Sequence, residues 1–379
     1  MTLRRPTFVG AETSFVQLYR HLGPLFAAAA AIVAMLTWPR AFDLEAYLAA
    51  AGLVATGQDP YAATRAAGVA EWGQGQVYVS PPFVAQLLAP FADLPIDALF
   101  VVWSVVSLAA LVGAIFLVRR DALAARAPLV VFSFVYIWGS LWMGQVNLFA
   151  LAGLLLALGS PSDRLAGFGF ALAIVTRALP GAFGIVLLLE RRWRAIAWAA
   201  AAVGLVMLIS PADWQSFLAV SREAGTLPTL PVIVQTSLAP YPVLWAAAVA
   251  GVAFVLISAV VRPVDRPLMV GTAIGVALVL LPTNAWHHWL SFGLAPLFLF
   301  GHRRLWSRMA LIAFMVASYL PIGALTSAVA LATLAVMVVI SARTVIHAYR
   351  SGSHATSSGS QPPHNAASGG PTGPQRDAE

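Results

Sequence analysis

The side chains with the clearest chemical potential in this sequence lie beside long apolar segments. Asp43 and Glu45 follow directly after the first such segment, in "TWPRAFDLEAY". A carboxyl that is partly desolvated at a membrane surface has a raised pKa and can act as a general base. The alternative is that both carboxylates are the solvated beginning of a loop helix. Because they are two positions apart, they point in different directions on a helix and share one face only in an extended segment.

Arg177 lies in the middle of an apolar segment, "LAGFGFALAIVTRALPGAFGIVLLLE". An arginine at membrane depth costs about 2.5–3.5 kcal/mol on insertion scales and usually faces a cavity or a partner. Its planar guanidinium can bind a phosphate or a carboxylate through two hydrogen bonds. The alternatives are that Arg177 extends to the outer interface of the membrane, or that it forms a structural ion pair with a loop carboxylate.

Two further groups of polar side chains lie beside apolar segments, in "MGQVN" and in "PTNAWHHW". Gln145 and Asn147 carry amides that need partners in lipid, either a ligand or neighbouring helices. His287 and His288 diverge by about 100° on a helix, and no third His or Cys follows at ligand spacing, so we predict no zinc site. One histidine could act as a general acid or base or donate to an anion, or the pair could pack beside Trp286 at the interface.

The composition identifies the elements that must position these residues. Of 379 residues, 60% are apolar and 10% are charged, whereas soluble domains carry about 25% charged residues. The mean hydropathy is +0.83, and apolar segments long enough to cross a membrane recur along the chain. Cysteine is absent, which excludes disulfides, thiolate nucleophiles and Cys-ligated metals. The sequence therefore predicts an all-α polytopic membrane protein.

The basic residues predict the orientation of these helices. All 22 are arginine, the net charge is +7, and they cluster in short loops, which is typical of cytoplasmic loops. No basic face with interleaved aromatic residues suggests nucleic acid. Threading the chain between the arginine clusters gives about 12 membrane helices, two of them short, with both termini cytoplasmic. We expect one membrane domain over residues 1–350 and a disordered cytoplasmic tail over 351–379.

Proline and glycine predict the breaks in this arrangement. Pro180 should divide 165–190 into two short helices that turn at Thr176–Gly181. The first outer loop, 40–95, should hold interfacial helices, one ending near Gly57 and one beginning at Pro81 and Pro82. With the second outer loop, 211–240, this arrangement gathers the polar candidates on the extracytoplasmic side.

The order of these motifs resembles that of the GT-C fold glycosyltransferases. Within that fold the chain is similar to glycosyltransferase family 87 (GT87), whose members use polyprenyl-phosphate mannose. The similarity runs across most of the chain, through the segments "DLEAYLAAAGLVATGQDPY", "SPPFVAQLLAPFADLP", "GQVNLFALAGLLLAL", "AIVTRALPGAFGIVLLLERRWRA" and "LPTNAWHHW". The chain departs from the family pattern at three places. Ser80 stands where a tyrosine is usual, Arg177 stands where a lysine is usual, and Asn284-Ala285-Trp286 replaces Ser-Trp-x before the histidines.

The resemblance implies an inverting transfer of a sugar, mannose first, from a polyprenyl-phosphate carrier to a hydroxyl of a lipid or glycan acceptor. Asp43 would be the general base, with His287 and His288 as further catalytic residues, and Arg177 would contact the donor phosphate. The remaining substrate-binding residues implied are Gln145, Asn147, Tyr47, Tyr61 and Trp286. It implies a plasma-membrane enzyme with its active site on the extracytoplasmic face. We expect neither a metal nor a cofactor beyond the lipid-linked donor.

Two alternatives remain open from the sequence. One is an arabinosyltransferase that uses a polyprenyl-phosphate pentose, since nothing in the motifs separates it from a mannosyltransferase. The other is a membrane transporter or lipid flippase. We find no internal repeat of the kind that transporters carry, and the polar residues gather at one face rather than at mid-depth.

Overall fold

The computed structural model describes residues 9–67, 78–118, 131–224, 236–261, 265–282, 290–300, 305–319 and 323–357. All regular elements in these ranges are helices, which confirms the predicted all-α class. Trp286, His287 and His288 lie outside the described residues. The last helix, α17 (Gly323–Ser357), continues past residue 351, where we predicted the tail to begin. The proposed disorder of the tail stays a prediction.

Three of the described helices are long and apolar enough to cross a membrane: α5 (Ile96–Val118), α13 (Pro242–Val261) and α17. Two bent pairs raise this number to five if each pair is one span. The first pair is α1 (Val9–Thr37) with α2 (Phe42–Ala55), which meet at 61°, and the second is α11 (Trp193–Ile209) with α12 (Pro211–Ala224), which meet at 102°. These apolar helices indicate a multi-pass membrane protein. The predicted count of about 12 membrane helices stays a prediction.

The interior of the bundle is built from shorter helices that pack closely. More than half of the residues are buried in α7 (Val135–Trp142), α8 (Asn147–Gly159), α9 (Asp163–Thr176), α14 (Arg266–Leu280) and α15 (Leu290–Phe300). α16 (Leu305–Tyr319) packs beside them with a smaller buried share. Small residues bring their backbones together. A Cβ atom added to Gly153 of α8 would lie 2.4 Å from the Gly169 carbonyl oxygen of α9. Glycine at this crossing therefore fixes how α8 packs on α9. α8 begins at Asn147 and α9 ends directly before Arg177, so this crossing also positions two residues of the candidate site.

The predicted break within 165–190 is confirmed. α9 ends at Thr176, Arg177 adopts an extended conformation, and Pro180 lies in the first turn of the 3₁₀ helix η3 (Leu179–Phe183). The chain then continues into α10 (Gly184–Leu189). Because Arg177 terminates α9 rather than continuing it, its side chain leaves the helix toward the first outer loop.

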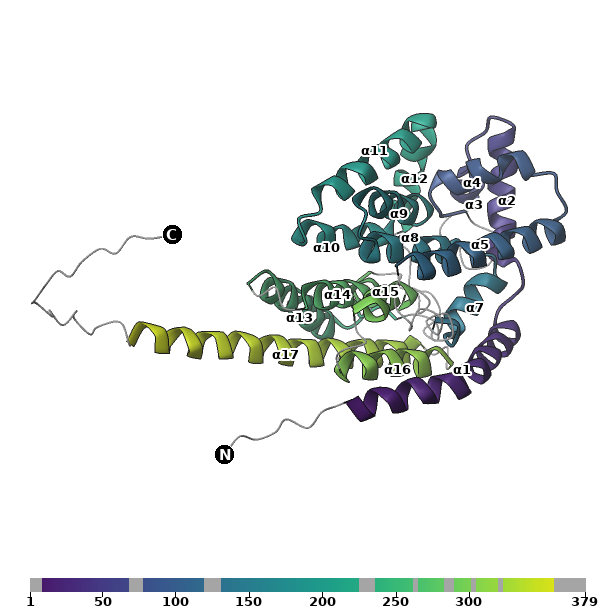
Figure 1. Cartoon of the computed structure of the whole chain (residues 1–379). Coiled ribbons are helices and arrows are strands. Elements are labelled where there is room, and N and C mark those ends of the chain that lie inside the picture. Colours follow the sequence, from purple (N-terminus) through teal and green to yellow (C-terminus); the bar gives the residue numbers. More distant parts are fainter. Residues whose placement is uncertain are drawn as a thin grey trace, which may run out of the picture.

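Residues 40–95, which we predicted to be an outer loop and continue to call the first outer loop, contain helices that lie together on one side of the molecule (Figure 1). These are α2, α3 (Ala62–Ala67) and α4 (Pro82–Leu88), which is extended by the short η2 (Ala89–Phe91). Their buried side chains form a second hydrophobic cluster, separate from the main core. The predicted start of a helix at Pro81 and Pro82 is confirmed, since Pro81 is the N-cap of α4.

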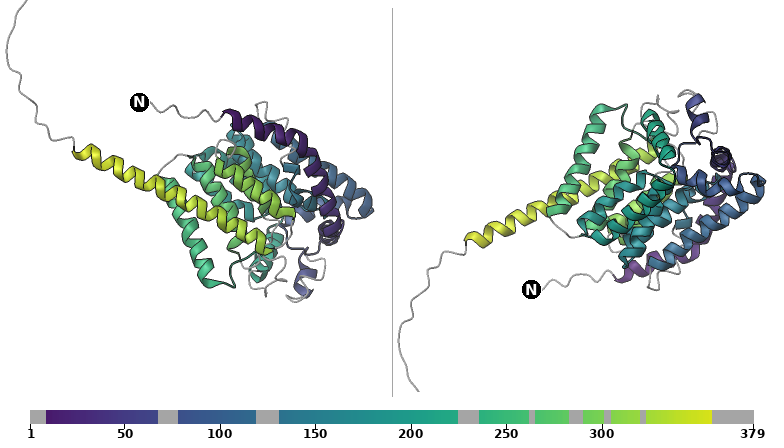
Figure 2. Two further views of the ribbon diagram at one scale, coloured as in Figure 1. Left: turned by 90° about the horizontal axis from the view of Figure 1, so that it is seen from below. Right: turned by 90° about the horizontal axis from the view of Figure 1, so that it is seen from above.

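Helix α12 was not predicted, because we expected an outer loop over 211–240. It is amphipathic rather than apolar, and its buried residues Trp214, Phe217 and Val220 pack into the cluster of the first outer loop. Pro211 at its first position and the spacing of these apolar residues are the signals that could have found it. At the opposite side, α17 extends beyond the other helices in both views of Figure 2.

Candidate active site

Asp43 is positioned by main-chain hydrogen bonds to the "MGQVN" turn. Its N–H donates to the Met143 carbonyl at 2.9 Å, and the Ala41 N–H donates to the Trp142 carbonyl at 2.9 Å. Ala41 adopts a left-handed conformation (φ 58°), which turns the chain from α1 into α2. A non-glycine residue in this region is strained, and such strain persists only where the surrounding contacts impose it. The turn therefore fixes the place where α2 begins.

Gly144 allows this close approach. Its φ is +72°, and an added Cβ atom would lie 2.6 Å from the Cβ of Leu44. Both the conformation and the space require glycine. Since Leu44 follows Asp43 directly, the fit between Gly144 and Leu44 helps to hold the carboxylate beside the turn.

The amides that we singled out in this turn form a buried network. The Gln145 Oε1 accepts a hydrogen bond from Asn147 Nδ2 at 2.5 Å and one from Ser140 Oγ at 3.1 Å. With its oxygen engaged, Gln145 has its NH₂ group left to donate, and its side chain lies within hydrogen-bonding reach of the Asp43 carboxyl. Asp43 Oδ2 and Asn147 Oδ1 are buried and have no hydrogen-bond partner among the described residues. These unpaired acceptors suit a ligand that brings its own donors.

Arg177 approaches the same place from the end of α9. Its Nη1 donates to Ser80 Oγ at 3.3 Å, while its Nε is buried and lacks a hydrogen-bond partner in the part of the chain that the structure describes. No ion pair among the described residues includes it. Although it forms no ion pair within the described ranges, its guanidinium lies close enough to interact electrostatically with Asp43 and with Tyr47. The guanidinium is thus available to an anion, which is the arrangement expected for a phosphate site.

The two predicted tyrosines differ in their surroundings. Tyr47 lies one turn after Asp43 on α2, is buried against Tyr78 with the ring centroids 6.0 Å apart, and interacts with Ser80. Tyr61 lies further along the chain, and its hydroxyl donates to the Ser80 carbonyl at 2.6 Å. The Tyr61 hydroxyl is therefore engaged in holding Ser80, whereas Tyr47 borders Asp43 and Arg177. Substrate binding by either tyrosine stays a prediction.

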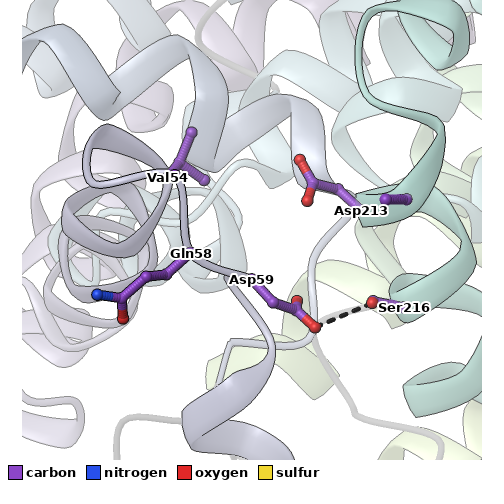
Figure 3. Close-up of a pocket in the computed structure, with 7 residues that line it drawn as sticks. Val54, Gln58, Asp59, Asp213 and Ser216 are labelled. Carbon is purple, nitrogen blue, oxygen red and sulfur yellow. Dashed lines mark hydrogen bonds between the residues drawn. The ribbon is translucent and has the colours of Figure 1, made fainter.

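A separate polar cavity lies at the far end of α2 (Figure 3). Its volume is about 350 Å³, and it is lined by Val54, Gly57, Gln58, Asp59, Ala212, Asp213 and Ser216. Among the described residues, no group of three or more His, Cys, Asp or Glu side chains could hold a metal ion. We did not predict this cavity, because one of its walls belongs to α12.

A comparison with protein families decides the class of this protein. The model of Glycosyltransferase family 87 matches residues 78–282, which is more than half of the chain. The chain belongs to glycosyltransferase family 87. Comparisons with curated proteins and with solved structures found no match.

As a family 87 member with several apolar helices, the protein is a membrane glycosyltransferase that uses donor and acceptor substrates. The matched segment of this family 87 transferase contains Ser80, Gln145, Asn147 and Arg177. Asp43 precedes it, and its place beside these residues comes from the fold alone. Ser80 is the residue of this group that we noted only as a departure from the family pattern. Its contacts with Arg177 and with Tyr61 connect the first outer loop to α9.

Proposed function

We propose that this family 87 transferase is an inverting enzyme of the GT-C fold. It transfers a sugar, with mannose as the first candidate, from a polyprenyl-phosphate carrier to a hydroxyl of a lipid or glycan acceptor. The observation that carries the proposal is the meeting of Asp43, Gln145 and Arg177, which come from three different segments of the chain. The carboxylate can take the proton of the attacking hydroxyl, and the guanidinium, which forms no ion pair among the described residues, can stabilise the leaving phosphate.

The proposed reaction is a single displacement at the anomeric carbon. Asp43 accepts the proton of the acceptor hydroxyl, and the hydroxyl oxygen forms a bond to the anomeric carbon. The bond from that carbon to the phosphate oxygen breaks, and its electron pair leaves with the polyprenyl phosphate. Negative charge grows on the departing phosphate, so the Arg177 guanidinium stabilises the transition state more than the ground state. We expect no metal, because Arg177 supplies this charge.

The other predicted residues take supporting roles in this proposal. Gln145 orients the Asp43 carboxylate, Asn147 holds Gln145, and Tyr47 closes the side of the site next to Ser80. We propose that Trp286, His287 and His288 complete the donor pocket. We propose that the reaction takes place on the extracytoplasmic face of the plasma membrane, with both termini cytoplasmic, and the arginine distribution supports this orientation. A pentose donor is the second candidate, whereas family membership argues against a transporter.

The test is sugar transfer by the purified protein from synthetic polyprenyl-phosphate mannose and polyprenyl-phosphate arabinose. We expect Asp43→Asn to reduce the rate of transfer by about 10²- to 10⁴-fold, the usual contribution of a general base, with unchanged donor affinity. Glu45→Gln, two residues away on α2, is the matched control and should transfer at the wild-type rate. Wild-type transfer by Asp43→Asn would show that Asp43 is not the base.

A further inference from the structure

The cavity at the far end of α2 is separate from the group around Asp43. Val54, one of its lining residues, lies roughly 16 Å from Asp43 along the helix axis, at 1.5 Å per residue. Figure 3 shows Val54 and Gln58 on one side of the cavity, and Asp213 and Ser216 on the other. Its volume of about 350 Å³ is within the range of small-molecule sites.

The carboxylates of this cavity are held in fixed positions. Asp59 accepts hydrogen bonds from its neighbour Tyr61 N–H at 2.9 Å, from Ser216 Oγ at 3.0 Å, and from Arg65. Asp213 accepts one from Gln86 Nε2 of α4 at 3.1 Å. The side chains of both walls are therefore already ordered, so ligand binding does not include the free-energy cost of immobilising them.

The charge of the cavity excludes an anionic ligand and disfavours a metal. Asp59 forms an ion pair with Arg65, whereas no ion pair among the described residues includes Asp213. The lining thus carries more negative than positive charge and would repel a phosphate. Both oxygens of Asp59 already accept hydrogen bonds, which leaves too few free oxygen ligands for a calcium or magnesium ion. Neutral ligands with many hydroxyl donors fit carboxylate, amide and hydroxyl groups of this kind best.

We propose that this cavity binds sugar units of the acceptor that are distant from the reacting hydroxyl. The acceptor class is then an extended neutral glycan, free or as a lipid headgroup, because a single sugar is too short to span the roughly 16 Å along α2 between Asp43 and Val54 of the cavity. This inference rests on the proposed function. In this arrangement the two substrates bind at sites of different charge. The anionic lipid phosphate of the donor binds at Arg177, and the neutral acceptor chain binds at Asp59 and Asp213.

The first test compares acceptors of different length in the full-length enzyme. Asp213→Asn removes the charge with little change of shape, and Ala212→Trp fills the cavity from an exposed position. We expect both variants to raise the KM for a mannotetraoside acceptor by about tenfold, since hydrogen bonds to charged groups are stronger than neutral ones. The KM for a monosaccharide acceptor should stay unchanged. Asp93→Asn, an exposed carboxylate outside the cavity, is the matched control.

The second test measures binding without turnover, by equilibrium dialysis of labelled mannotetraose against the purified protein. We expect wild type and Asp93→Asn to bind, and Ala212→Trp to lose binding while it keeps the wild-type unfolding temperature. If both cavity variants transfer sugar to the mannotetraoside with unchanged KM, the cavity is not an acceptor site. Absence of sugar transfer from any polyprenyl-phosphate donor to any acceptor would overturn the proposed function instead, and the dialysis would still decide whether the cavity binds glycans.

Discussion

Arg177 brings a positive charge to Asp43 from a helix that ends one residue earlier, and its Nε atom has no partner among the described residues. We expect Arg177→Gln to lower kcat/KM by about 10²- to 10³-fold, the loss that follows removal of one preorganised oxyanion donor in a hydrolase. Arg177→Lys keeps the charge but not the planar fork, so it should retain most of the activity. Steady-state kinetics with a polyprenyl-phosphate donor check this, and equal loss in both variants would argue against a role for the charge.

Asp59 provides a pH-dependent contact between the first outer loop and α12. Partial burial alone would raise its pKa, but hydrogen bonds from Tyr61, Arg65 and Ser216 lower the pKa of Asp59 below its ordinary value of 3.8. A lowered folded-state pKa means that the stabilisation is complete above pH 3.8 and is lost as the pH falls through the folded-state value. In detergent at pH 6, the unfolding temperature of the wild type should therefore be higher than that of Asp59→Asn. This difference in unfolding temperature should become smaller below pH 3.8. A difference independent of pH would contradict this assignment.

Residue types predicted part of the candidate site. Asp43, Gln145, Asn147 and Arg177 were singled out because polar groups beside apolar segments need partners, and the fold brings them together. The role of Ser80 could not be predicted, because its contacts with Arg177 and Tyr61 join positions far apart in the chain. Asp59 and Asp213 line the same cavity only because α12 packs against the first outer loop, and no local sequence pattern predicts this packing. The histidine pair stays a prediction, since residues 283–289 lie outside the described ranges.

At the scale of elements, the contact between α2 and the "MGQVN" turn holds Asp43 beside Gln145 and so determines the geometry of the candidate site. Gly144→Ala should lower the unfolding temperature and the transfer rate, because a Cβ atom would overlap Leu44 in addition to straining a positive φ, a strain that costs about 1–3 kcal/mol. Gly57→Ala is the matched control for stability. Its φ is +71°, and its added Cβ would meet nothing within 4 Å. Equal loss of unfolding temperature in both variants would show that the contact with Leu44 adds nothing to the backbone strain.

Breaks between elements were easier to predict than amphipathic helices. Pro180 and the Pro81–Pro82 pair act through local sterics, so the end of α9 and the start of α4 could be read from the sequence. α12 has a mixed polar and apolar sequence, and its helical state depends on burying Phe217 against Tyr61, with Trp214 packed against Phe217. That partner surface belongs to the first outer loop, about 150 residues earlier in the chain. The helical structure of these residues therefore depends on tertiary packing more than on local hydropathy.

At the scale of the whole molecule, the orientation in the membrane is open to a direct test. The chain contains no cysteine, so single cysteines can be introduced without a background. We expect Gln58→Cys, in the first outer loop, to react with a membrane-impermeant maleimide on intact cells. Glu190→Cys, beside the arginine cluster after α10, should react only after permeabilisation. Both residues are exposed in the structure. The reverse labelling pattern would overturn the proposed extracytoplasmic active site.

The main-chain hydrogen bonds at the beginning of α2 also make its docking observable by hydrogen exchange. The amides of Ala41 and Asp43 donate to the carbonyls of Trp142 and Met143, in a segment about 100 residues later. Both amides should exchange with deuterium slowly and at one common rate, because protection is lost only when the two segments separate. Deuterium uptake at these two amides would then measure how often the proposed base leaves its position, and a bound donor should slow it.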